Sequence, residues 1–95
     1  MYISITTSRV NGKDEVELEK FLADFLPKVK EQPGAEAIYH YARPGKSDEC
    51  TVVIWRDEES FTAYNESELV MEAVTFELNH GIKSVREAYP TLFSI

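Results

Sequence analysis

The chain has 95 residues, of which 43% are hydrophobic, and its formal net charge is −7. One domain over residues 1–95 is expected at this length, and the acidic balance argues against nucleic acid as a partner. The sequence has no membrane-length apolar run, no signal-peptide pattern, no zinc-binding cysteine pairs and only one cysteine. We therefore expect a cytoplasmic protein that binds neither a membrane nor a metal.

The N-terminal third is typical of a strand followed by a long helix. Met1–Thr7 is rich in β-branched residues and alternates along the chain, as strand residues do. Asp14 and Glu17 have the spacing of a capping box, and apolar residues then recur at helical spacing. These patterns predict a helix over residues 14–31, with Pro27 expected to kink its last turns.

Two strands joined by a polar hairpin follow that helix. Ala35–Ala42 is the first of them, and alternation places His40 on the face opposite its neighbouring tyrosines. Arg43–Asp48 is rich in turn-forming residues, and Thr51–Arg56 is the next strand. The sequence of that strand, TVVIWR, is apolar on both faces.

The acidic residues gather in the C-terminal half. Residues 57–79 include seven Asp or Glu and no Lys or Arg, which indicates solvated helical faces. Asp57 is the expected cap of a short helix, and a second helical segment is expected to begin at Asn65 or Ser67. Gly81 is expected to end that segment.

The last residues complete a β-α-β-β-α-β order. A further helical turn is expected through Val85, and Thr91–Ile95 is predicted to be a short closing strand. This order predicts an α+β, ferredoxin-like fold: a four-stranded antiparallel sheet with helices on one face. The other face would be bare, yet Thr51–Arg56 is apolar on both sides, so we expect a homodimer through the sheet faces.

Two segments resemble the antibiotic biosynthesis monooxygenase (ABM) superfamily. Gln32–Ala35 is similar to the EPG end of that family's first helix, and Glu19, Phe21 and Leu22 precede it at matching positions. Cys50–Tyr64, CTVVIWRDEESFTAY, is similar to the family's strand and helix signature W-x-[DS]-x-x-[AS]-[FW]. The resemblance covers roughly residues 1–80.

The resemblance implies a dimeric α/β-barrel and, for many members, oxygenase activity without a metal or a flavin. Such members oxidise electron-rich aromatic substrates such as quinols or anthrones, and the substrate anion supplies electrons to O₂. The protein then needs a dry pocket, a base for the substrate hydroxyl and polar groups that hold the developing anion.

One branch of the family degrades haem, and its residue pattern is absent here. That branch implies an Asn near the end of the first strand, a Trp in the second helix and an axial His beyond it. The corresponding residues of this chain are Thr7, Tyr64 and Val74, and His80 lies outside that register. We therefore expect no haem and no other cofactor.

Three residues are candidates for the site. His40 has the side chain suited to act as the general base for a phenol near neutral pH, and a hydrogen-bonded surface or interface histidine is the alternative. Trp55 and Tyr64 are candidate substrate-binding walls, with core packing as the alternative for both.

Four other reactive residues have structural interpretations. Cys50 is expected to be a small core residue, and His80 a cation favoured by a helix C-terminus. Arg43 and Arg56 are expected to pair with nearby acids. Neither histidine lies in a nucleophile motif, which argues against hydrolysis through Ser or Cys.

The leading hypothesis is a cofactor-independent monooxygenase that acts on a small, electron-rich aromatic, quinol- or anthrone-like substrate. The alternative is a non-catalytic small-molecule-binding or stress-response dimeric module of the same fold, and a third hypothesis is an isomerase or ring-modifying enzyme. A His40 side chain inside an apolar pocket would favour catalysis, whereas a solvent-facing one would favour passive binding.

Overall fold

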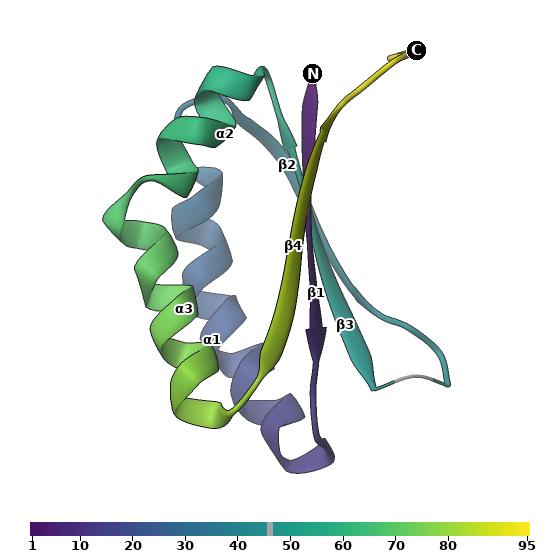
Figure 1. The fold of residues 1–95 in the computed structure, drawn as a ribbon, viewed down its shortest axis with the longest axis vertical. Helices are drawn as coiled ribbons and strands as arrows, with labels where there is room; N and C mark the ends of the chain where they lie inside the picture. The colour runs from purple at the N-terminus through teal and green to yellow at the C-terminus, as the bar shows by residue number, and fades with distance from the viewer. Residues whose placement is uncertain (46) are drawn as a thin grey trace.

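A computed structural model describes residues 1–45 and 47–95, and its seven elements form two layers (Figure 1). In chain order they are β1 (Tyr2–Arg9), α1 (Gly12–Lys30), β2 (Ala35–Ala42), β3 (Asp48–Trp55), α2 (Glu58–Asn65), α3 (Glu68–His80) and β4 (Lys83–Pro90). Lys46, in the expected hairpin loop, lies outside the described residues. No helix among the described residues is both long and apolar enough to cross a membrane.

The four strands form one antiparallel sheet. Its strand order is β2-β3-β1-β4, so β1 pairs with β3 on one side and with β4 on the other. Within residues 1–45 and 47–95, the three helices lie on one face of the sheet and none covers the opposite face (Figure 1). The predicted α+β, ferredoxin-like fold is confirmed, with the second helix divided into α2 and α3.

The helix-facing side of the sheet is identified by its buried residues. Trp55 is 0% exposed and forms the main core with Val53 of β3, Ala35 of β2, and Phe25 and Val29 of α1. Residues that pair with these across the strands share their face, because side chains opposite each other in a sheet point the same way.

The alternation along β1 is inverted relative to an ordinary half-covered sheet. Ser4 pairs with Val53, Thr6 with Thr51, and Ser8 with Glu49, so these hydroxyl side chains point toward the helices. Ile3 and Ile5 occupy the other face. The central strand therefore brings polar groups inside and leaves apolar ones outside.

The outer face of the sheet exposes several apolar side chains, with the Glu87 carboxylate of β4 among them. Tyr39 of β2 is 62% exposed and Val85 of β4 is 60% exposed, and Tyr89 is exposed beside them. Val52 lies between these strands, paired with Tyr39 on one side and with Ile5 on the other.

Two expected helix ends are confirmed and one expected cap is wrong. The Asp57 carboxylate accepts hydrogen bonds from the Ser60 amide at 2.8 Å and the Ser60 hydroxyl at 2.6 Å, which lowers the pKa of Asp57. Gly81 ends α3 in the left-handed conformation. The capping box at Asp14 is not formed, because α1 begins earlier and Asn11 is its cap residue.

The predicted end of the chain is also wrong. Residues expected to form a helical turn and a loop are the edge strand β4, and Thr91–Ile95 is not a strand. The inward residues of β4 are Ser84, Arg86 and Ala88, so the strand lacks the apolar inward pattern that identifies a strand in sequence. Beyond β4, the Thr91 amide donates a hydrogen bond to the Met1 carbonyl at 3.0 Å.

Gly34 is the glycine whose replacement should cost most. It has a φ of +83°, and a Cβ there would collide with the Ser60 side chain that Asp57 holds. We predict that Gly34→Ala lowers the free energy of unfolding by more than about 2 kcal/mol, because strain and overpacking add. Denaturant unfolding measures this. Gly12→Ala is the control, since nothing lies near its added Cβ, and an equal loss in both variants would contradict the prediction.

Candidate functional site

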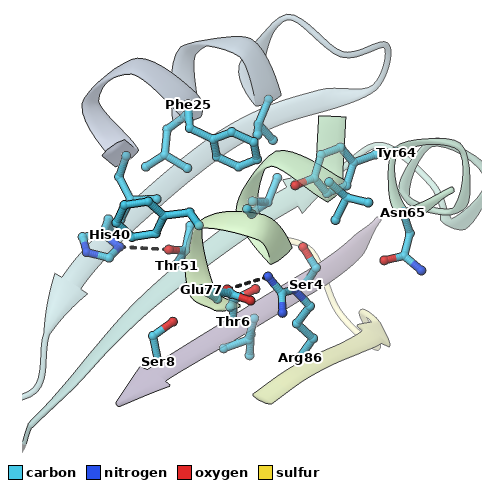
Figure 2. A pocket seen from close by; sticks show the side chains of 18 of the residues that line it. Ser4, Thr6, Ser8, Phe25, His40, Thr51, Tyr64, Asn65, Glu77 and Arg86 are labelled. Carbon is cyan, nitrogen blue, oxygen red and sulfur yellow. Dashed lines mark hydrogen bonds and ion pairs between the residues drawn. The ribbon is translucent and has the colours of Figure 1, made fainter. Parts of the chain in front are cut away.

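A cavity of about 200 Å³ lies between the sheet and the helices (Figure 2). Its roof comes from the helices and is mostly apolar: Leu18, Phe21, Leu22, Phe25, Leu26, Val29, Phe61, Val70, Ala73 and Phe76, with Tyr64, Asn65 and Glu77 as its polar members. Its floor is polar and comes from the sheet: Ser4, Thr6, Ser8, His40, Thr51 and Arg86. An apolar enclosure with a few convergent polar groups is the usual form of a small-molecule site.

His40 lies at one end of this floor, and both of its ring nitrogens have partners. Nδ1 is 2.9 Å from the Thr51 hydroxyl, the residue opposite His40 in the sheet, and Nε2 is 2.7 Å from Oε1 of Glu49. The His40 side chain is 21% exposed and that of Glu49 only 4%. The two strands thus hold the imidazole in one orientation at the cavity.

Tyr64 lines the cavity on the side away from His40 (Figure 2). Its ring stacks on Trp55 with centroids 5.2 Å apart. Burial raises the pKa of Tyr64 to about 12, with Arg86 lowering it and Glu77 raising it to smaller extents. Tyr64 is therefore a neutral phenol at ordinary pH, able to donate a hydrogen bond.

Trp55 lies one layer behind the cavity. Its side chain is fully buried and is not among the lining residues; Nε1 donates a hydrogen bond to Ser4 Oγ at 3.0 Å. Of the three residues selected from sequence, the fold brings His40 and Tyr64 to the same cavity, and Trp55 supports Tyr64 from the core.

A charged pair lies at the edge of the cavity formed by β4 and α3. Arg86 Nη2 donates to Glu77 Oε2 at 2.7 Å, and the Ser84 hydroxyl donates to the same oxygen at 2.9 Å. Ser84 Oγ is also 2.8 Å from Ser8 Oγ of β1. This network fixes the Arg86 guanidinium group at the edge of a cavity whose helix-derived lining is mostly apolar.

Sequence reasoning missed Glu49, Thr51, Arg86 and Asn65 as residues of this region. Thr51 and Glu49 become partners of His40 only through the register of β2 and β3. Arg86 was missed because its segment was expected to be a helical turn and a loop, and not the strand β4 that borders the cavity. The available signal was the row of hydroxyl residues in β1, which an ordinary core strand would not place inward.

The other reactive residues have structural surroundings. Arg43 pairs with Asp48 at 3.5 Å and Arg56 with Asp57 at 3.3 Å, as expected. Cys50 is buried, with its sulfur 3.8 Å from the Thr7 hydroxyl.

Haem does not fit the residues at this cavity. Thr7 belongs to the outer face of the sheet, and neither Val74 nor His80 lines the cavity; His80 stacks on Phe76 instead. Among residues 1–45 and 47–95, no cluster of three or more His, Cys, Asp or Glu side chains could hold a metal ion.

Comparison with known proteins identifies the fold. No family model and no curated protein matches the chain. A candidate antibiotic biosynthesis monooxygenase from Deinococcus radiodurans superposes with a TM-score of 0.91 and 13% identity, covering 100% of this chain and 96% of that one. SnoaB, a cofactor-independent oxygenase from Streptomyces nogalater, superposes with a TM-score of 0.84 and 15% identity, covering 99% of this chain and 95% of SnoaB.

A haem degrader of the same fold is similar as well. MhuD from Mycobacterium tuberculosis, whose structure holds two haems in its active site, superposes with a TM-score of 0.74 and 18% identity. The superposition covers 100% of this chain and 99% of MhuD. The chain thus shares the fold of these proteins, as its resemblance to the ABM superfamily predicted. At these identities the likeness shows the fold alone.

The raised pKa of Tyr64 has a consequence for stability. The folded protein holds the phenol proton more tightly than the unfolded chain, so this contribution is complete below about pH 10 and is lost as the pH rises toward 12. In the wild-type protein, ionisation of Tyr64 should lower the free energy of unfolding by roughly 2 kcal/mol between pH 10 and pH 12. We predict that Tyr64→Phe lacks this decrease, because phenylalanine has no proton to lose. Denaturant unfolding as a function of pH tests this, and identical slopes in both proteins would contradict it.

Proposed function

We propose that this chain is a monooxygenase that oxidises a small, electron-rich aromatic substrate of the quinol or anthrone kind without a bound cofactor. The observation that carries the proposal is the placement of His40. Its imidazole lies on the polar floor of an otherwise apolar cavity, fixed by Thr51 and Glu49. The ABM fold, shared with a cofactor-independent oxygenase, supports this choice of chemistry.

The chemistry begins with loss of a proton from the substrate. An electron-rich phenol or enol becomes a much better electron donor as its anion, and His40 is the group that takes the proton. For an anthrone-like methylene, the substrate provides all four electrons that reduce O₂. One oxygen atom becomes the new carbonyl, and the other leaves as water with the two methylene hydrogens.

The cavity supplies the remaining requirements through its walls. The mostly apolar, helix-derived roof offers water few partners, and a drier site strengthens the electrostatic interactions inside it. Tyr64 remains protonated and can donate a hydrogen bond to a substrate oxygen, while Trp55 fixes its ring from behind. Arg86 lies where it can stabilise the negative charge that develops on the substrate.

Passive binding is the second candidate, and one observation favours it. Both ring nitrogens of His40 already have protein partners, as in a purely structural histidine. Oxygen consumption separates the two functions, since a binding module would fill the cavity without consuming O₂.

We predict that the purified protein consumes O₂ with at least one member of a panel of hydroquinones, anthrones and catechols, faster than a heat-denatured sample. His40→Ala should lower this rate tenfold or more, because general bases contribute roughly 10²–10⁴-fold. His80→Ala is the control, since that histidine does not line the cavity. An unchanged rate in His40→Ala would remove His40 from the mechanism, and no consumption with any compound would favour passive binding.

We also propose that two copies associate through their outer sheet faces. Tyr39 pairs with Val52, and the exposed Val85 and Tyr89 of β4 lie on the same face on either side of Glu87. No helix of residues 1–45 and 47–95 covers this surface. Burying such a face against an identical one would remove apolar area from water without demanding a further element of the chain. A small acidic domain has a thin core, so this association would also add to its stability.

The proposed dimer can be tested by a substitution that places a charge at the centre of the outer sheet face. Val52→Asp should raise the dissociation constant at least about a hundredfold, because a buried unpaired charge costs roughly 2–5 kcal/mol. Val16→Asp is the control, since Val16 is exposed on α1. Size-exclusion chromatography with light scattering at micromolar concentration gives the mass. A wild-type monomer, or a dimer unaffected by Val52→Asp, would refute this interface.

A further inference from the structure

The three groups at the His40 end of the cavity form a chain of hydrogen bonds. Glu49 Oε1 lies 2.7 Å from His40 Nε2, and His40 Nδ1 lies 2.9 Å from Thr51 Oγ1. Both His40 and Thr51 line the cavity (Figure 2), whereas Glu49 is buried and is not among the lining residues. The order from the interior to the cavity is therefore carboxylate, imidazole and hydroxyl.

The direction of each hydrogen bond follows from the chemistry of the carboxylate. An ionised Glu49 can only accept, so the proton of a neutral His40 ring belongs on Nε2. Nδ1 is then an acceptor, and the Thr51 hydroxyl must donate to it. The remaining lone pairs of Thr51 Oγ1 are left to accept a hydrogen bond from a ligand.

The surroundings of Glu49 reinforce this arrangement. Its second oxygen, Oε2, is buried without a hydrogen-bond partner among the described residues. Its hydrogen bond to His40 Nε2 at 2.7 Å holds the imidazole in one orientation. A carboxylate in that position can also hold an imidazolium that forms when a substrate proton arrives.

We propose that Glu49, His40 and Thr51 form a proton relay in which the Thr51 hydroxyl, and not the imidazole, contacts the hydroxyl group of the substrate. The substrate O–H bond breaks as its proton passes to Thr51 Oγ1, and the original Thr51 proton passes to His40 Nδ1. The products are a substrate oxyanion and an imidazolium that Glu49 holds. This inference rests on the proposed function, and it makes Glu49 a positioning residue for His40.

The relay also resolves the difficulty that both nitrogens of His40 are occupied. A base that acts through Thr51 needs no free nitrogen, since the Thr51 hydroxyl is at once the donor to His40 and the acceptor for the substrate. The other titratable or charged side chains that face the cavity are Tyr64 on α2, Glu77 on α3 and Arg86 on β4, whereas Glu87 pairs with Ile5 and points to the outer face of the sheet. The α1 residues that line it are all apolar.

The first test needs no turnover. Nitrogen-15 NMR of the imidazole, at a pH where the ring is neutral, should show the His40 proton on Nε2 and Nδ1 as a hydrogen-bond acceptor. Glu49→Gln should reduce the share of this tautomer, because an amide can donate as well as accept. A proton on Nδ1 in the wild-type protein, or an unchanged tautomer in Glu49→Gln, would overturn the relay.

The second test follows a phenol in the cavity. With 4-nitrophenol as the probe, the wild-type protein should lower the pH at which the phenol ionises by about one unit, a tenfold change. Thr51→Val, which removes only the hydroxyl, should abolish this shift, and Thr51→Ser should restore most of it. Thr62→Val, on an exposed position of α2, is the control for the substitution itself.

The outcomes separate the relay from the proposed oxygenase. A wild-type shift of the probe that Thr51→Val retains, or no shift in the wild type, would overturn the relay. Loss of the shift in Thr51→Val without O₂ consumption by any aromatic would support the relay and refute the oxygenase. Equal O₂ consumption by wild type and Thr51→Val would support the oxygenase and overturn the relay.

Discussion

The alternation of side chains along β1 is the constraint on which the rest of the structure depends. Because β1 lies between β3 and β4, its register decides which residues of both neighbours face the helices. That register turns Ser4, Thr6 and Ser8 inward and the isoleucines outward. A polar cavity floor and an apolar outer face are thus two results of one arrangement.

Most of the fold could be predicted from local patterns. The apolar periodicity of α1, the β-branched character of the strands and the caps at Asp57 and Gly81 are local signals, and the structure agrees with them. Failure came at β4, whose charged and small inward residues give no strand signal. Pairing with β1 overrides that weak local preference, and pairing is not visible in a single sequence.

The candidate site was predictable only in part, for the same reason. His40 and Tyr64 could be selected as candidates from the chemistry of their side chains alone. Glu49, Thr51 and Arg86 are ordinary surface or strand residues until the sheet register brings them to the cavity. The role of Trp55 also depends on contacts between residues far apart in sequence. Its hydrogen bond to Ser4 and its stacking on Tyr64 place it in the core behind the cavity lining.

The hydroxyl-lined floor also implies a compromise in the evolution of the chain. Hydroxyl groups turned toward a domain interior contribute less burial free energy than valine or isoleucine would at the same positions. Substitutions that replaced them with aliphatic side chains would raise thermostability while filling the space a ligand occupies. Stabilising this domain by such substitutions would therefore close the cavity, so its stability and its capacity to hold a ligand are opposed at these positions.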